Sequence, residues 1–479
     1  MAPQPPALQR ESLLGHALLA LLLAAAAAPA PAAAKGVQLS SSVMVFENSQ
    51  FWSKCDTLLA AAATHGSRSV NIVPTFYWID SRFRGLPRTC NPDGWAVGSR
   101  VDSYCYQHAG QEGCQPWNRK ELSEVTRGLT SCLTKAFDLF DEVLVSPHLD
   151  DGTRTGHWRN LLIFDPLEKD AYGFSYDDIM IRPITRAARA ALSKARPGAA
   201  PKTLWFGMQG EMGGTVFHHP EGYSAISRRI RADLSNLGPS NKVLIGALLN
   251  HALLPGVLNR GPDPGPSPQP PSAMAAYSGG WGPLLPLAEW PGAARIRAAL
   301  PAARTLFERD VDFLGISNYN RAPVDVGPSD MENAVAKYEA ELAAMGIDLQ
   351  ALIRAGKRFI YNEVALGGGV SECGNVPATT AEEAARFPWM GIYTRYTRET
   401  DPFKTYDPRA QGVAPRKYMH RWYDALLEVL ARGGLKYKVE GAYIWSCCGS
   451  WDIQGVYSST YADAAVTERI RQHNKDMER

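Results

Sequence analysis

The sequence predicts an α/β protein, and within that class a single (β/α)8 TIM barrel with long inserted loops. Three observations predict it. Short apolar or β-branched runs alternate with longer amphipathic stretches along the chain. Eight strand-then-helix units follow one another in order, as this barrel requires. Most of the runs are continuously apolar, which is typical of strands buried on both faces.

The predicted strands are short apolar runs bounded by polar or turn-forming residues. They cover residues 37–46, 69–76, 142–147, 203–208, 243–249, 311–319, 357–364 and 441–446. The predicted helices lie around residues 52–59, 122–140, 177–195, 223–237, 293–308, 331–355 and 417–432, and a last helix closes the chain. A doubly wound open sheet is the alternative, but no Gly-x-Gly-x-x-Gly follows the first strand and no P-loop occurs.

Length and composition agree with one globular domain. The chain has 479 residues, of which 45% are hydrophobic and 20% charged, which excludes a mostly disordered chain, a collagen and a coiled coil. A barrel with insertions can take more than about 400 residues as a single domain, so we expect one domain over residues 35–479. Residues 255–291 form a Pro/Gly-rich insertion that is predicted to be a loop, and 367–415 is a second loop-rich stretch.

The first 34 residues read as a secretory signal peptide. Arg10 precedes an apolar run at 13–28, and small residues at 30–34 offer a cleavage site. The run is too short and too rich in alanine for a membrane span. A plastid transit peptide is the alternative, but the segment contains little Ser or Arg. We therefore expect a secreted, extracellular protein.

The cysteines fit an oxidising compartment. There are eight, an even number. Cys90, Cys105 and Cys114 crowd one region rich in Gly, Pro and Tyr, which predicts disulfides that pin a long loop, with Cys55 or Cys132 as a further partner. The connectivity stays open at this point.

Polar residues gather where the predicted strands end, which is where barrel enzymes hold their active sites. These residues are His148, Asp150 and Asp151 after the third strand, Glu211 after the fourth, Asn318, Tyr319 and Asn320 at the sixth, Asn362 and Glu363 at the seventh, and Trp445 at the eighth. Glu211 and Glu363 are expected to face each other across the barrel mouth. Glycoside hydrolysis needs such a pair, since one carboxyl protonates the leaving oxygen and the other attacks the anomeric carbon.

Several short motifs resemble clan A glycoside hydrolases. They are WFGMQGE at 205–211, FIYNE at 359–363 and Trp445. VSPHLD at 145–150 and FLGISNY at 313–319 are similar to the family 113 β-mannanase group. The resemblance implies a retaining double displacement with Glu211 as acid/base, Glu363 as nucleophile and Tyr319 as a hydrogen-bond donor to Glu363. Where most of the clan has Asn before the acid/base, this chain has Gly210, so the sugar 2-hydroxyl needs another contact, such as Gln209.

Eight residues are candidates for binding substrate, each with an ordinary packing role as the alternative. They are His148, Asp150, Gln209, Asn318, Tyr319, Asn362, Trp445 and Trp78. Trp445 offers an aromatic plane for an apolar sugar face. For the two catalytic roles we expect a raised pKa at Glu211 and an ionised Glu363. No metal is expected, because the spacing of His148, Asp150 and Asp151 fits no familiar ligand set.

The sequence therefore predicts a secreted retaining glycoside hydrolase that cleaves a β-linked polysaccharide, mannan-like or another β-glycan. A non-catalytic, lectin-like saccharide-binding barrel and a transglycosylase are the alternatives. The expected partner is a poly- or oligosaccharide, with no cofactor. The formal net charge of +2, from 50 basic and 48 acidic residues, gives no field for nucleic acid or a membrane surface. We expect a monomer.

Overall fold

A computed structural model describes most of the chain after the predicted signal peptide. The described residues are 36–46, 49–85, 100–107, 113–194, 200–237, 241–261, 282–319, 321–370, 376–386, 388–391, 396–445 and 452–478. The predicted signal peptide, most of the Pro/Gly-rich insertion, Asn320 and the cysteines at 90, 373, 447 and 448 lie outside them.

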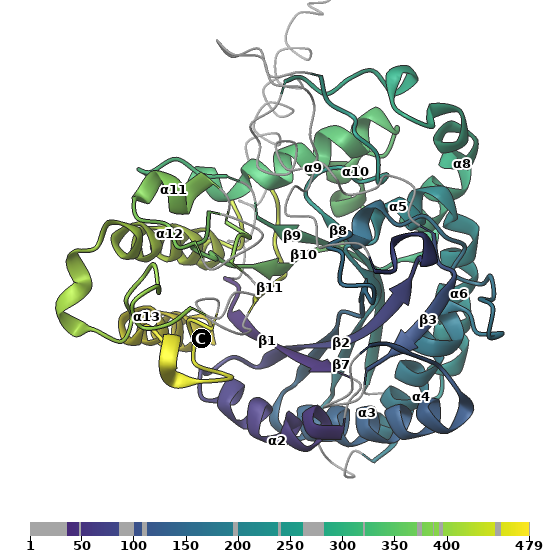
Figure 1. The fold of residues 1–479 in the computed structure, drawn as a ribbon, viewed down its shortest axis with the longest axis horizontal. Helices are drawn as coiled ribbons and strands as arrows, with labels where there is room; N and C mark the ends of the chain where they lie inside the picture. The colour runs from purple at the N-terminus through teal and green to yellow at the C-terminus, as the bar shows by residue number, and fades with distance from the viewer. Residues whose placement is uncertain are drawn as a thin grey trace, which may run out of the picture. The chain divides into compact units, whose positions relative to one another are not determined.

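Within the described residues, eight parallel strand positions close into a barrel, and the predicted fold is confirmed. The strands are β1 (Leu39–Phe46), β2 (Ser69–Ile79), β5 (Glu142–Val145) with its continuation β6 (His148–Asp151), β7 (Thr203–Gly210), β8 (Lys242–Asn250), β9 (Phe313–Asn318), β10 (Arg358–Val364) and β11 (Gly441–Ile444). Closure comes from β1, which pairs in parallel with both β2 and β11. Figure 1 shows the ring of strands.

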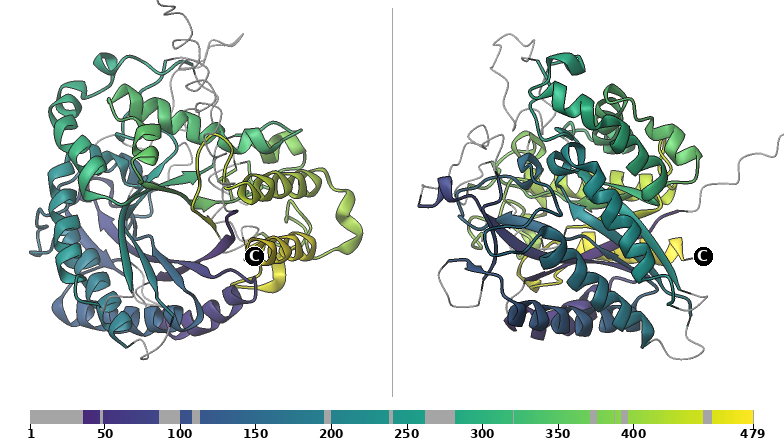
Figure 2. Two further views of the ribbon diagram at one scale, coloured as in Figure 1. Left: turned by 180° about the vertical axis from the view of Figure 1, so that it is seen from behind. Right: turned by 90° about the vertical axis from the view of Figure 1, so that its right-hand side faces the viewer.

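Helices lie around the outside of the strands in all three views (Figures 1 and 2). They are α2 (Ser49–Ala63), α3 (Arg119–Leu139), α4 (Arg182–Ser193), α5 (Gly213–His218), α6 (Pro220–Asp233), α8 (Ala293–Thr305), α9 (Asn333–Ala344), α10 (Leu349–Arg354), α11 (Ala381–Arg386), α12 (Ala414–Ala431) and α13 (Ala464–Met477). Local capping explains where some begin: the Asn118 side chain accepts a hydrogen bond from the Glu121 backbone N–H at the start of α3.

The long helix predicted over 331–355 is wrong, because the chain breaks it in two. α9 ends before Gly346, whose φ of 72° is a left-handed conformation that only glycine adopts without cost. Asp348 then starts α10 by accepting a hydrogen bond from the Ala351 N–H. The third predicted strand also differs, since it is interrupted around Pro147 and resumes as β6, which places His148 and Asp150 on a strand rather than in a loop.

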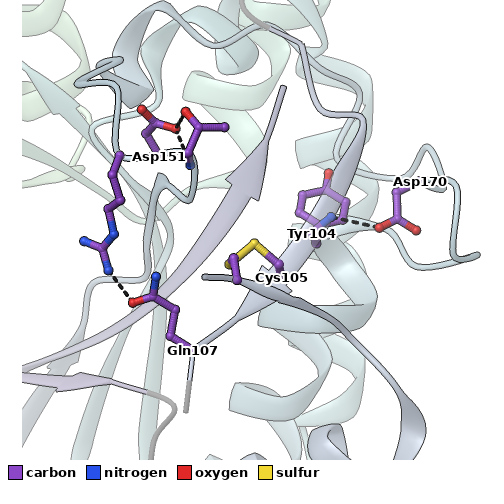
Figure 3. Close-up of a disulfide and its surroundings, with 8 residues drawn as sticks. Tyr104, Cys105, Gln107, Asp151 and Asp170 are labelled. Carbon is purple, nitrogen blue, oxygen red and sulfur yellow. Dashed lines mark hydrogen bonds between the residues drawn. A yellow bond between two sulfur atoms is a disulfide. The ribbon is translucent and has the colours of Figure 1, made fainter. Parts of the chain in front are cut away.

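The cysteine-rich region forms an extension of the sheet that the sequence did not predict. β2 runs on to Ile79 and pairs there with the antiparallel β3 (Ser103–Tyr106), which pairs with β4 (Gln115–Pro116). A disulfide joins Cys105 to Cys114 (Figure 3), and a second joins Cys55 on α2 to Cys132 on α3. Cys105 and Cys114, which the sequence predicts in disulfides, are thus bonded to each other across a short loop.

The barrel interior changes from apolar to polar toward the carboxyl ends of the strands. Its lower layer is a cluster of seven large side chains: Leu144, Trp205, Leu244, Leu248, Phe313, Ile360 and Tyr443. Above it, Asn71 accepts a hydrogen bond from Ser146 and donates one to Ser42, and Asn362 donates one to Ser317. Because buried polar groups need partners, this paired layer forms a polar floor under the barrel mouth.

Candidate active site

Glu211 stands at the end of β7 on a turn whose backbone is constrained. Its φ of 57° lies in the left-handed region, which is uncommon for residues other than glycine and is concentrated at functional sites. Its N–H donates to the Leu248 carbonyl (3.0 Å), and the Gln209 side-chain oxygen accepts from the Met212 N–H (2.9 Å). Gln209 therefore holds the turn, while its buried Nε2 has no partner among the described residues.

Glu363 stands near the end of β10, beside a register shift that lies between Tyr361 and Glu363. Its carboxyl is held from two sides. The Tyr319 hydroxyl donates to Oε2 (3.1 Å), as the resemblance implies, and His148 Nε2 lies 2.9 Å from Oε1. All three side chains are buried.

His148 and Trp445 form the wall beside Glu363. Their rings are stacked, with centroids 5.2 Å apart and planes 13° apart. Burial lowers the pKa of His148 to about 3, so its imidazole is neutral. When the Glu363 carboxyl is ionised, Nε2 carries the imidazole hydrogen and donates to it; when that carboxyl is protonated, Nε2 of the other tautomer is bare and accepts from it. Its Nδ1 and the Trp445 Nε1 are buried with no partner among the described residues.

The two glutamates are electrostatically coupled. Burial raises the pKa of Glu211, and the negative charge of Glu363 raises it further, against Arg159 and a hydrogen bond from Ser317. Burial also raises the pKa of Glu363 to about 7, against the effects of Arg159 and the Tyr319 hydrogen bond. The raised pKa at Glu211 agrees with the sequence prediction. That Glu363 is ionised stays a prediction, because with a pKa of about 7 its carboxyl is only partly ionised at neutral pH.

Arg159, which sequence reasoning missed, bridges two acidic groups at this site. Its Nη1 donates to Asp150 (2.6 Å) and its Nη2 to Glu211 (2.8 Å). It comes from a short 3-10 helix, Arg159–Leu161, in the loop after β6. No strand-end signal marks this residue, since it lies eight positions beyond β6.

Two of the eight proposed substrate-binding residues are not brought to the site. Trp78 lies within β2 rather than in a loop and is completely buried in the main core between sheet and helices. Asn318 donates to the Met331 carbonyl (2.9 Å), which is a structural contact. Asn362 is in the polar floor, where its Oδ1 has no partner among the described residues. His148, Asp150, Tyr319 and Trp445 are brought together around the two glutamates, directly or through Arg159.

Asn250 is a second residue that sequence reasoning missed. It ends β8, its register partner on β9 is Ser317, and Ser317 in turn pairs with Glu363 on β10. It is fully buried, and neither of its amide atoms has a partner among the described residues. Its position directly after the fifth predicted strand is the signal that could have found it.

Comparisons with known proteins were made at the level of sequence and of structure. No protein family model and no curated protein sequence matches the chain. The solved structures that resemble it include an endo-β-1,4-mannanase from Thermotoga petrophila (13% identity, 92% of this chain and 77% of that chain, TM-score 0.37). They also include an endo-1,4-β-mannanase from Rhizomucor miehei (10%, 92% and 98%, TM-score 0.33) and a GH10 endoxylanase from a sugarcane soil metagenome (10%, 91% and 97%, TM-score 0.35). At such low identity and TM-score, these structures say nothing about the function of this chain, and only the side chains of its site bear on it.

Two features are absent from the described residues. No helix among them combines the length and apolar character needed to cross a membrane. Nor do three or more His, Cys, Asp or Glu side chains among them come together as a metal site.

Proposed function

We propose that the protein is a retaining glycoside hydrolase that acts on a β-linked saccharide, with Glu363 as nucleophile and Glu211 as acid/base. The observation that carries the proposal is the pair of buried, coupled glutamates at the carboxyl ends of β7 and β10. Burial raises the pKa of both carboxyls, so that one can be protonated while the other is ionised. Two such groups in one barrel mouth, with a stacked tryptophan beside them, are the parts that glycosidic bond cleavage requires.

The residues divide the work in two steps. In the first, the ionised Glu363 attacks the anomeric carbon, the bond from that carbon to the leaving oxygen breaks, and Glu211 gives its proton to that oxygen. In the second, Glu211 takes a proton from water, the water oxygen attacks the same carbon, and Glu363 leaves as a carboxylate. Tyr319 supports Glu363 as an anion before the first step and after the second, because its hydroxyl donates to Oε2.

The surroundings of the pair combine apolar and polar side chains. Met44, Val73, Tyr319, Ala365, Trp389, Met390 and Trp445 form an apolar cluster at the mouth. Apolar sugar faces pack against such surfaces, while hydroxyls need donors and acceptors. The buried unpartnered atoms of Gln209, Asn250, Asn362 and His148 are of that kind. A mannan-like β-glycan is the substrate class that the sequence resemblance favours.

Secretion is part of the same proposal. Two disulfides between described cysteines agree with an oxidising compartment. The alternative, a plastid or another endomembrane compartment, would be separated from it by following the tagged full-length chain into the medium.

The test is hydrolysis of a panel of β-mannan, β-glucan and β-xylan oligosaccharides, with the anomer of the first product read by NMR. We expect wild type to release products with retained configuration and Glu363→Gln to release none while keeping its circular dichroism spectrum. Equal turnover by both chains would contradict the proposal. Products of inverted configuration would mean that Glu363 is not a nucleophile. Transfer to sugar acceptors in place of water would identify a transglycosylase. Saccharide binding without turnover by wild type would favour the lectin-like alternative.

A further inference from the structure

Arg159 lies between two acidic side chains in a place nearly closed to water. The Arg159, Asp150 and Glu211 side chains are only 11%, 16% and 7% exposed. Charges in such surroundings interact more strongly than on the surface, because less water screens them. A cation held here therefore acts on every carboxyl of the site.

The side chain next to this arginine ties its segment to two others. The next residue, Asn160, accepts a hydrogen bond from the Gly213 N–H (3.0 Å) and donates one to the Leu253 carbonyl (2.8 Å). Position 213 has no room for a side chain, since a Cβ there would lie 2.1 Å from the Leu254 carbonyl oxygen and 2.9 Å from Asn160 Oδ1. Asn160 thus links Arg159 by hydrogen bonds to the turn that carries Glu211.

The loop that leads to Arg159 is equally ordered. The Asp151 carboxylate accepts hydrogen bonds from the backbone N–H groups of Thr153, Thr155, Gly156 and His157. Figure 3 shows this carboxylate above the Cys105–Cys114 disulfide. Several N–H donors on one carboxylate make a rigid turn, so the arginine is presented to Glu211 rather than free to sample solvent.

The charges that face the two glutamates come from each element packed against them. Arg159 and Asp150 come from the loop after β6 and from β6, His148 from β6, and Tyr319 from the end of β9. His148 is neutral and Tyr319 is a hydroxyl donor, so among these described groups the positive charge is that of Arg159. It favours a negative charge on Glu211 and on Glu363, whereas Asp150 opposes one on Glu363.

We propose that Arg159 is a positioning residue that keeps the Glu211–Glu363 pair in its singly charged state, and that Asp150, its other ion-pair partner, limits the effect of Arg159 on Glu363. The inference rests on the proposed function, since only a double displacement needs one protonated and one ionised carboxyl at the same time. Its effect on the carboxyls themselves can nevertheless be measured without a substrate.

The experiment is a pH titration of the full chain with glutamate labelled by carbon-13 at the side-chain carboxyl. The two signals are assigned by their loss in Glu211→Gln and Glu363→Gln. We expect Arg159→Met to raise both titration midpoints by about 1–3 pH units, the usual effect of removing a neighbouring opposite charge. Arg159→Lys, which keeps the charge, should titrate close to wild type, and Asp150→Asn should lower the Glu363 midpoint.

Arg154→Met is the matched control. Arg154 lies in the same loop but is exposed and donates to Gln107, so its removal should leave both midpoints unchanged. If Arg159→Met does not fold because Asp150 has lost its ion pair with Arg159, Arg159→Met/Asp150→Asn removes both charges, and the Glu211 midpoint should still rise. Midpoints equal to wild type in the variants without Arg159, or Arg159→Lys behaving like Arg159→Met, would overturn the role of Arg159.

The two proposals fail in different ways. Shifted midpoints in a protein that hydrolyses no glycan would defeat the proposed function and leave the electrostatic role of Arg159 standing. If the protein hydrolyses a glycan but the midpoints do not shift in the variants without Arg159, the proposed function stands and the role of Arg159 is wrong.

Discussion

The imidazole of His148 occupies the space into which a side chain at position 210 would project. A Cβ on Gly210 would lie 2.5 Å from His148 Cδ2 and 2.9 Å from Nε2. The same Nε2 holds Glu363. Position 210, which precedes the proposed acid/base, is therefore restricted to glycine as long as the imidazole of His148 stays beside Glu363.

Gly210→Ala should therefore disable the site without unfolding the barrel. The added methyl group pushes the His148 ring away from Glu363, and misplacement of this size costs about 100-fold in kcat/KM. Adding His148→Ala to Gly210→Ala should remove the two closest contacts, leave the Pro147 carbonyl oxygen at 3.0 Å, and recover part of the thermal stability, though not the contact to Glu363. Gly412→Ala is the control, since nothing lies within 4 Å of a Cβ there. Full activity of Gly210→Ala would show that the ring has room to move.

Glu211→Ala should lose activity in proportion to how much its substrate needs protonation. General acid catalysis contributes about 10²–10⁴-fold, so hydrolysis of a natural glycan should fall by that factor. A dinitrophenyl glycoside has a leaving group that needs no proton, so formation of its glycosyl-enzyme should stay near the wild-type rate. Pre-steady-state release of dinitrophenol measures that step, and added azide should speed its breakdown. An equal loss on both substrates would assign Glu211 a structural role.

The sequence predicts the barrel and both glutamates because each depends on local pattern. Apolar runs give the strands, and strand order fixes which ends meet at one rim, so Glu211 and Glu363 follow directly. Arg159 was not predicted because its position depends on tertiary hydrogen bonds of its neighbour Asn160 to Gly213 and Leu253. Such contacts leave no periodic pattern in the sequence. Trp78 lies beyond the end of the predicted strand, which stops at residue 76. In the structure β2 runs on to Ile79 and pairs with β3, so Trp78 is buried in a strand and not in a loop.

Tyr319→Phe should move the acid limb of the pH profile upward. Glu363 must be ionised to attack, so kcat/KM is expected to rise with pH through its pKa of about 7. The Tyr319 hydrogen bond favours the ionised form, and losing it should raise that pKa by about one unit. Tyr361→Phe is the control, because the buried Tyr361 hydroxyl has no partner among the described residues. An unmoved acid limb in Tyr319→Phe would show that another group sets it.

The two disulfides between described cysteines should affect stability and activity differently. Cys105–Cys114 packs against the turn after Asp151, since a Cβ on Gly152 would lie 3.0 and 3.1 Å from the two sulfurs. Cys55–Cys132 joins two outer helices across 77 residues. Loop-closure entropy predicts a loss of about 4 kcal/mol for Cys55→Ser/Cys132→Ser and about 2–3 kcal/mol for Cys105→Ser/Cys114→Ser. We expect the larger stability loss to leave kcat/KM unchanged and the smaller one to lower it, as measured by urea unfolding and initial rates. If Cys105→Ser/Cys114→Ser keeps its kcat/KM while Cys55→Ser/Cys132→Ser loses it, the turn after Asp151 does not influence the active site.

Glu363 should destabilise the folded protein at alkaline pH. Its pKa rises from 4.5 to about 7 on folding, so the folded state holds the proton more tightly than the unfolded state. The resulting stability is fully present below pH 4.5 and is lost as pH rises through 7, a change of about 3 kcal/mol. Glu363→Gln cannot ionise, so its unfolding free energy relative to wild type should increase by about that amount between pH 4.5 and pH 8. Urea unfolding of both chains at the two pH values measures the difference, and a difference that does not vary with pH would mean that Glu363 is already ionised at low pH in the folded site.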